Sequence, residues 1–153
     1  MDYERLNAQL SSLCEGVKFR VTLLSNAAAL LYNEMEGINW AGFYLAKDGD
    51  LYLGPFQGKP ACTFIAAGRG VCGAAAAQGK TLIVPDVHTF PGHIACDPSS
   101  RSEIVLPLKV GGRLWGVLDV DAPTKGRFDE SDRRGLEEFT AILEKTLEET
   151  AGF

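Results

Sequence analysis

Residues 102–122 read SEIVLPLKVGGRLWGVLDVDA, and this stretch decides the fold class. Two strand-like runs rich in Val, Leu and Ile stand on either side of Gly111-Gly112, and a glycine pair between such runs is a strong signal for a tight β-hairpin. Residues 39–58, NWAGFYLAKDGDLYLGPFQG, repeat the arrangement around Asp48-Gly49. Two hairpins in one chain predict an antiparallel sheet.

Helical patterns lie at both ends of the chain. Residues 3–13 form a short amphipathic pattern, and from Val17 apolar residues recur at intervals of three and four, which predicts a long helix that ends near Gly37. Asp129 is a suitable N-cap for a last helix. Four apolar residues of that helix share one face: Leu136, Phe139, Leu143 and Leu147.

The segment between the two hairpins predicts one further helix and one strand. Residues 68–79, GRGVCGAAAAQG, read as a helical turn bounded by glycines, and residues 81–87, TLIVPDV, as a short strand closed by Pro85-Asp86. We therefore expect a single α+β domain over residues 1–153. Its central antiparallel sheet should carry the N- and C-terminal helices on one face.

Composition excludes several classes of function. The 153 residues carry a net charge of −5, with 46% apolar and 23% charged residues and no basic stripe, so we expect no nucleic-acid partner and no membrane surface. The first residues, MDYERLNAQLSSL, lack the basic and apolar regions of a signal peptide, and no apolar run is long enough for a membrane span. We expect a cytoplasmic protein, in which cysteines favour thiol chemistry or metal binding over a structural disulfide framework.

Two of the four cysteines are comparable candidates for a nucleophile. Cys72 lies in the first turn of the helix predicted from Gly70, where unpaired N–H groups stabilise a thiolate or, alternatively, hold a ligand carboxylate. Cys96 lies close in sequence to His93 and Arg101, whose positive charges favour a thiolate. The sequence alone leaves both open.

The other two cysteines have weaker individual signals. Cys14 stands in a helical region beside Leu13 and is best explained as a small apolar packing residue. Cys62 lies in a loop after the first hairpin. A zinc site is a further alternative, but the chain has no C-x-x-C pair, so we expect no metal and no cofactor. The ligands of such a zinc site would be drawn from Cys62, Cys72, His88, His93 and Cys96.

Three carboxylates stand on the second hairpin. Asp119 and Asp121 alternate with Val120, so they project from one face of a strand, and Glu103 opens the partner strand. A strict two-residue loop at the glycine pair would set Glu103 opposite Val120 and hence on the other face. We expect a bulge, a three-residue loop or a site beyond the strand end to bring the three carboxylates together. If buried, such a cluster is costly and indicates function.

Trp40 and Tyr44 are four residues apart on the first predicted strand and therefore share a face. They either belong to the core or line one wall of a site.

The chain resembles a known family in its central and later parts. Residues 58–108, GKPACTFIAAGRGVCGAAAAQGKTLIVPDVHTFPGHIACDPSSRSEIVLPL, together with GVLDVDAP at 116–123, are similar to the free methionine-(R)-sulfoxide reductases, which are single GAF domains. The resemblance extends from about Asn39 to Phe128. The spacing of three cysteines, the PGHIACD loop and the D-x-D strand are more specific than general GAF features.

The resemblance implies roles for the cysteines. Cys96 would be the attacking thiolate and Cys62 the recycling thiol, with Cys72 near enough to form an alternative disulfide. Attack on the sulfoxide sulfur would release methionine and leave a sulfenic acid, which a second thiol converts to a disulfide. A thioredoxin-type reductant would then restore the enzyme. The family also suggests a homodimer.

The resemblance likewise implies the substrate contacts. Glu103, Asp119 and Asp121 would bind the amino acid and supply a proton to the leaving oxygen, and Trp40 and Tyr44 would hold the sulfoxide methyl group. A carboxyl among like charges in an apolar pocket has a raised pKa and suits proton donation. The alternative hypothesis is a GAF module that senses a small ligand and has redox-sensitive cysteines.

Overall fold

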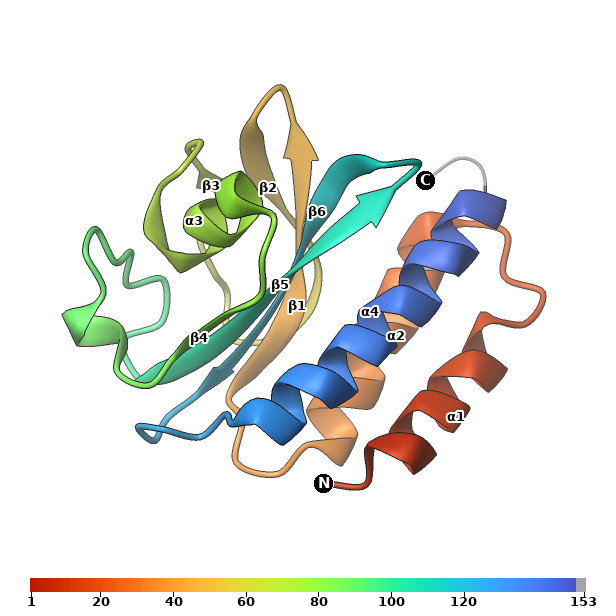
Figure 1. Cartoon of the computed structure of the whole chain (residues 1–153), viewed down its shortest axis with the longest axis horizontal. Coiled ribbons are helices and arrows are strands. Elements are labelled where there is room, and N and C mark those ends of the chain that lie inside the picture. Colours follow the sequence, from red (N-terminus) through yellow and green to blue (C-terminus); the bar gives the residue numbers. More distant parts are fainter. Residues whose placement is uncertain (151–153) are drawn as a thin grey trace.

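The computed structural model describes residues 1–150, and these form a six-stranded antiparallel sheet with the order β3-β2-β1-β6-β5-β4 (Figure 1). The strands are β1 (Trp40–Lys47), β2 (Asp50–Gly58), β3 (Phe64–Ile65), β4 (Leu82–Val84), β5 (Ser102–Val110) and β6 (Arg113–Ala122). The helices are α1 (Tyr3–Cys14), α2 (Arg20–Glu34), α3 (Gly70–Gln78) and α4 (Glu130–Glu149), with a 3-10 turn at Val87–Thr89.

The helices divide between the two faces of the sheet (Figure 1). Helices α2 and α4 pack on one face, and α1 packs on both of them rather than on the strands. Helix α3 and the loop before β5 cover the other face. The α+β class and the placement of the terminal helices on one face are confirmed.

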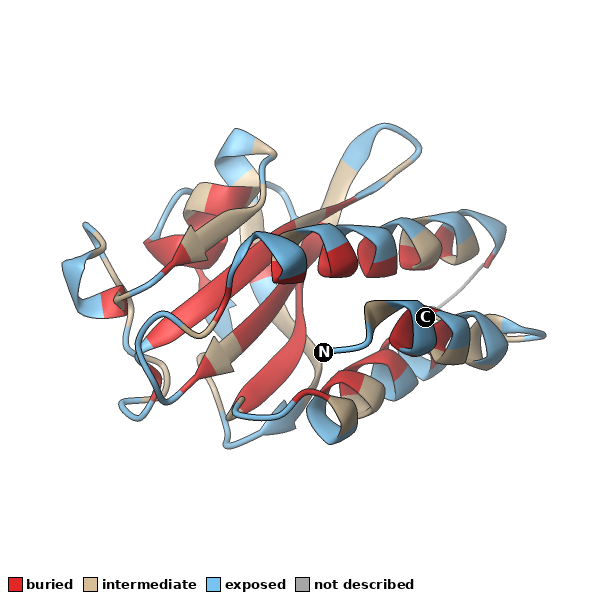
Figure 2. Cartoon of the chain, turned by 60° about the horizontal axis from the view of Figure 1, so that its bottom comes forward, coloured by how far each residue is buried: buried red, intermediate tan, exposed pale blue. Residues whose placement is uncertain are grey.

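Alternation along the strands separates two apolar clusters. On β5, Ile104 and Leu106 face the long helices, whereas Val105 faces α3. Helices α2 and α4 turn their buried stripes toward the sheet, and the outer faces of the helices are exposed (Figure 2). The fully buried face of α4 contains the four residues expected from the sequence, Leu136, Phe139, Leu143 and Leu147.

Several element boundaries differ from the sequence expectation. Helix α2 begins at Arg20 rather than Val17 and ends at Glu34, before the left-handed Gly37 (φ 76°). Asp129 is confirmed as the N-cap of α4, where its carboxylate accepts a hydrogen bond from the Asp132 amide in a capping box. The sequence reading missed β3 and the 3-10 turn, because two or three residues are too few to show a period.

A β-bulge lies near the tip of the β5–β6 hairpin. Val110 pairs with Arg113, as a two-residue loop requires, but Leu108 pairs with Gly116, so Trp115 is the additional residue on β6. From the bulge onward every pair is displaced by one residue, and Glu103 lies opposite Asp121 instead of Val120. The expected irregularity is thus confirmed as a bulge, and it puts Glu103, Asp119 and Asp121 on the same face.

None of the helices in the described part of the chain has the length and apolar character needed to cross a membrane.

The residue after the bulge has no room for a side chain. A Cβ atom at Gly116 would lie 2.4 Å from the Tyr44 carbonyl oxygen. We expect Gly116→Ala to lower the free energy of unfolding by about 1–3 kcal/mol, since the backbone of β1 must shift. Urea denaturation of the oxidised protein measures this. Arg113→Ala, exposed on the same strand, should stay within about 0.5 kcal/mol of wild type, and equal effects for the two variants would contradict the close approach.

Candidate active site

A small cavity lies between the sheet and α3, on the side away from the long helices. Its volume is about 40 Å³, enough for a few water molecules. Its lining residues come from strands β1, β3, β5 and β6, from helix α3, and from the loops before β3, α3 and β5. Among its lining residues are eight that the sequence or the resemblance singled out: Trp40, Tyr44, Cys72, His93, Cys96, Glu103, Asp119 and Asp121.

The two predicted aromatic residues form one wall. The rings of Trp40 and Tyr44 are stacked with centroids 5.9 Å apart, and both side chains are almost fully buried. Trp40 Nε1 donates a hydrogen bond to the Lys59 carbonyl oxygen (3.1 Å), and the Tyr44 hydroxyl donates to the Cys62 carbonyl oxygen (3.0 Å). Phe56, which the sequence did not point to, also stacks on Trp40, with ring centroids 5.2 Å apart. These contacts fix the ring planes and hold the segment that carries Cys62.

Glu103, Asp119 and Asp121 form a carboxyl cluster at the base of the cavity. Glu103 and Asp119 are buried, with 7% and 6% of their surface exposed, and Asp121 is half-buried. Burial raises the pKa of all three carboxyls, and the negative charge of Asp119 adds to the rise for Glu103 and Asp121. Asp119 Oδ1 is buried without a hydrogen-bond partner in the described chain.

Positive charge near this cluster is scarce. Among the described residues that line the cavity, Arg69 and His93 are the basic ones, and Arg69 is exposed. Burial and the neighbouring His88 lower the pKa of His93, which favours its neutral form. The described cavity wall therefore places no fully charged, buried cation beside the carboxyl cluster to neutralise it, and a bound cation would stabilise the cluster.

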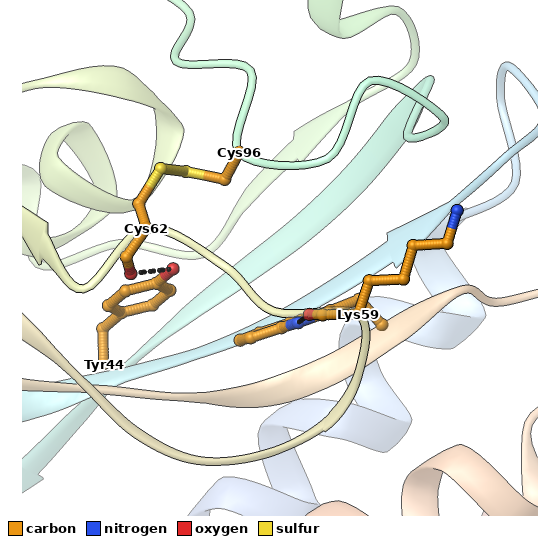
Figure 3. The surroundings of a disulfide bond; sticks show 5 residues. Tyr44, Lys59, Cys62 and Cys96 are labelled. Carbon is orange, nitrogen blue, oxygen red and sulfur yellow. Dashed lines mark hydrogen bonds between the residues drawn. A yellow bond between two sulfur atoms is a disulfide. The ribbon is translucent and has the colours of Figure 1, made fainter.

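A disulfide joins Cys62 to Cys96, and Cys96 lines the cavity (Figure 3). It links the segment after β2 to the loop before β5, with 5.4 Å between the two Cα atoms. Asn39 holds the same loop, because its Nδ2 donates to Asp97 Oδ2 (3.1 Å) and Ser100 Oγ (3.0 Å). Local pattern contains no clear signal for Asn39, because its partners lie about sixty positions further along the chain.

Cys72 does not behave as the helix-start argument predicted. It lies on the first turn of α3, but burial raises the pKa of its thiol, and Asp119, Glu103 and Asp121 raise it further. The expectation of a lowered pKa is wrong, because desolvation and three nearby carboxyls outweigh the backbone N–H groups. A protonated thiol is a poor nucleophile.

The zinc set considered from the sequence is not assembled. Cys62 and Cys96 are bonded to each other, and His88 is exposed and pairs with Asp86 at 3.3 Å. Cys14 packs with the helix-side cluster on the opposite face of the sheet from Cys72, as expected for a packing residue.

Comparison with known proteins gives consistent matches over nearly the whole chain. The GAF domain model matches residues 19–147. The free methionine-R-sulfoxide reductase of Escherichia coli (strain K12) is 51% identical over 148 residues, which cover 97% of this chain and 90% of the relative. The chain belongs to the free methionine-R-sulfoxide reductase family. Within this family, the reduced form of the Staphylococcus aureus protein has a TM-score of 0.93 at 49% identity and 95% coverage of both chains.

A second solved member of the reductase family is the Neisseria meningitidis protein in complex with its substrate. It has a TM-score of 0.92 at 47% identity and covers 95% of this chain and 88% of its own. These matches confirm the GAF fold and the resemblance, and they extend well beyond residues 39–128.

The raised pKa of Glu103 makes a prediction for stability. Because the folded protein holds this proton more tightly than the unfolded chain, the stabilisation is complete below the ordinary Glu pKa of about 4.3 and is lost as pH rises through the folded pKa. We expect Glu103→Gln to be more stable than wild type at pH 8, with the difference closing near pH 4. Each unit of pKa displacement corresponds to about 1.4 kcal/mol.

Urea unfolding of the oxidised proteins across this pH range measures the difference. Glu138→Gln, an exposed site on α4, is the matched control and should follow the wild-type curve. A Glu103→Gln variant that is less stable than wild type at pH 8 would show that the ionised carboxylate is satisfied in the fold.

Proposed function

We propose that this protein reduces free L-methionine-(R)-S-oxide to L-methionine with electrons from cysteine thiols. The observation that carries the proposal is a buried carboxyl cluster in need of a cation, set in the same cavity as Cys96 and its disulfide. Free methionine sulfoxide has an ammonium group to meet that demand, whereas a methionine inside a peptide has none.

Cys96 is the proposed nucleophile. Its thiolate attacks the sulfoxide sulfur, and the sulfoxide oxygen, together with one proton, is transferred to Cys96. Methionine is released, and Cys96 remains as a sulfenic acid. The Cys62 thiol then attacks the sulfenic sulfur, so that a disulfide forms and water leaves. The 5.4 Å between the two Cα atoms supports this step, since it falls within the usual disulfide range.

Glu103 is the proposed proton donor to the sulfoxide oxygen, with Asp121 as the alternative. Burial keeps the pKa of each carboxyl raised, so a proton remains available near neutral pH. Asp119 retains the strongest preference of the three for the ionised form, because the neighbouring Glu103, Asp121 and Cys72 side chains oppose the effect of burial on its pKa. Asp119 is accordingly the proposed partner of the substrate ammonium.

The remaining substrate groups have matching partners. Trp40 and Tyr44 offer a flat apolar wall for the sulfoxide methyl group. Gly70 and Val71, the first residues of α3, line the cavity, and a helix N-terminus favours a carboxylate. The substrate would thus span from the carboxyl cluster to α3.

The disulfide occupies the proposed nucleophile Cys96 and ties the loop before β5 to Cys62, which has consequences for the cycle. Substrate entry requires a reduced enzyme in which the loop before β5 is released from Cys62. A thioredoxin-type protein is the proposed reductant, since both disulfide cysteines are half-buried rather than enclosed. A reductant of this kind would favour the cytoplasm as the compartment.

The proposal also includes a single GAF domain and a homodimer. Helix α1 precedes the matched range of 19–147 but is joined to α4, where Asn7 Nδ2 donates to the Gly135 carbonyl oxygen at 3.2 Å. This supports one GAF domain over the chain, of which the last three residues lie outside the described part. The exposed apolar side chains of Val21 and Tyr32 on α2 suit a homodimer contact.

The first test is stereospecific turnover. With thioredoxin and its reductase, the wild-type protein should consume the R form of free methionine sulfoxide and leave the S form. Cys96→Ser should release no methionine, because the attacking thiolate is gone. Cys62→Ser should release about one equivalent of methionine and then stall at the sulfenic acid.

The outcomes separate the alternatives. Methionine released by Cys96→Ser, together with an inactive Cys72→Ser, would reverse the roles of these cysteines. Binding of the sulfoxide without turnover of either form would replace the enzyme with the sensor module. Cys14→Ser, on the other side of the sheet, is the control and should turn over like wild type.

A second test concerns the ammonium group. N-acetylation of the substrate removes the positive charge that Asp119 and its neighbours would bind. We expect kcat/KM to fall on the order of 100-fold, the usual cost of losing a charge-assisted hydrogen bond in a buried site. Asp119→Asn should reduce this preference for the free amino acid, whereas Glu138→Gln should keep it. Equal kcat/KM for both substrates in the wild-type protein would contradict the proposed role of the cluster.

A further inference from the structure

Cys72, Glu103 and Asp119 come from three different elements and converge at the base of the cavity. One ligand atom from each, the Cys72 Sγ and a carboxylate oxygen from each of the others, lie within 4.8 Å of one another, and all three residues are buried. Small side-chain movements would therefore bring both carboxylates and the sulfur within reach of one shared ion. The proposed reaction gives the Cys72 thiol no step of its own in this arrangement.

The cluster lacks a fixed partner at the point where the three groups meet. Asp119 Oδ1 is buried and has no hydrogen-bond partner in the described chain. Buried carboxylate oxygens are almost always paired or coordinate a metal. Around them the described cavity wall offers only the exposed Arg69 and the largely neutral His93 as bases.

We propose that Cys72, Glu103 and Asp119 bind a thiophilic divalent cation, with Zn²⁺ as the natural example. One sulfur and two oxygen ligands leave the fourth tetrahedral position for water, and the cavity of about 40 Å³ has room for an ion and its water. The cation takes the place of the protons on Cys72 and Glu103 and offsets the like charges of the cluster. The side chains close in on the ion to reach bond lengths of about 2.0–2.3 Å.

This site overlaps the one assigned to the substrate ammonium, and that part of the inference rests on the proposed function. Asp119 cannot be both a metal ligand and the partner of the ammonium group. Metal and free methionine sulfoxide therefore exclude each other, and the bound metal acts as a reversible inhibitor that leaves the Cys62–Cys96 pair chemically intact.

Cobalt binding to the oxidised protein tests the metal site directly. Cys62 and Cys96 are then held in the disulfide, so Cys14 and Cys72 are the free thiols. Titration with Co²⁺ should produce a thiolate-to-cobalt charge-transfer band in the near ultraviolet, and Zn²⁺ should remove it because it binds such sites more tightly than cobalt.

Variants of single residues show which side chains bind the cobalt ion. Cys72→Ala should abolish it, and Glu103→Gln should weaken cobalt binding by at least about tenfold, since even outer-shell partners of a metal cost that much when removed. Cys14→Ser should leave band and affinity unchanged. Circular dichroism confirms that each variant is folded. A missing band in the wild-type protein, or a band that depends on Cys14, would overturn the metal site.

The overlap with the substrate needs a protein that cannot react. In the Cys62→Ser/Cys96→Ser double variant loaded with Co²⁺, free methionine-(R)-sulfoxide should bleach the band, and the N-acetylated form should require at least about tenfold higher concentrations, as expected for a lost charge-assisted contact. A band that persists at saturating sulfoxide would overturn the exclusion. If the wild-type protein fails to reduce the sulfoxide, the proposed function falls while the cobalt titration still decides the metal site.

Discussion

One additional residue in β6 is the constraint on which the site depends. Side chains alternate between the two faces of a strand, so a change of register by a single position moves a residue from one face to the other. The bulge at Trp115 makes this change between the hairpin tip and the carboxyl cluster. It sets Glu103 opposite Asp121 and leaves Ile104 facing the long helices. Without it, Glu103 would point into the helix-side core and the cavity would lose a carboxyl.

The two faces of the sheet contribute to stability with opposite sign. The helix side is a continuous apolar core in which residues such as Phe43, Leu118 and Phe139 are fully buried, and burial of this kind supplies most of the stability of a domain. The α3 side holds like charges and a disulfide around a cavity, an arrangement that costs stability at neutral pH. The packed core on one face thus holds the strands in place, and those strands fix the positions of the energetically costly polar groups on the other face.

The sequence predicted the elements that have a period and missed the features that depend on long-range contacts. Both hairpins, the Asp129 cap and the shared face of Trp40 and Tyr44 followed from local pattern. The need for an irregularity between Glu103 and Asp121 also followed from the sequence, but its position at Trp115 did not, because a bulge, a three-residue loop or a site beyond the strand end would each have met that need. Phe56 and Asn39 became visible only in the structure, since their contacts join segments far apart in the chain.

Cys72 shows how a local rule gives way to its surroundings. A helix N-terminus stabilises a thiolate by a partial charge, but Cys72 is buried and faces Asp119, Glu103 and Asp121, so its thiol stays protonated. Protonation makes it a weak nucleophile and protects it from oxidation. Within the proposed mechanism, sulfenic acid forms on Cys96 because the carboxyl cluster that binds the substrate ammonium also suppresses the competing thiol. The negative charge that keeps the Cys72 thiol protonated, and so unreactive toward the sulfoxide, would also attract a divalent cation to Cys72. A metal ion can displace the thiol proton, whereas a sulfoxide cannot.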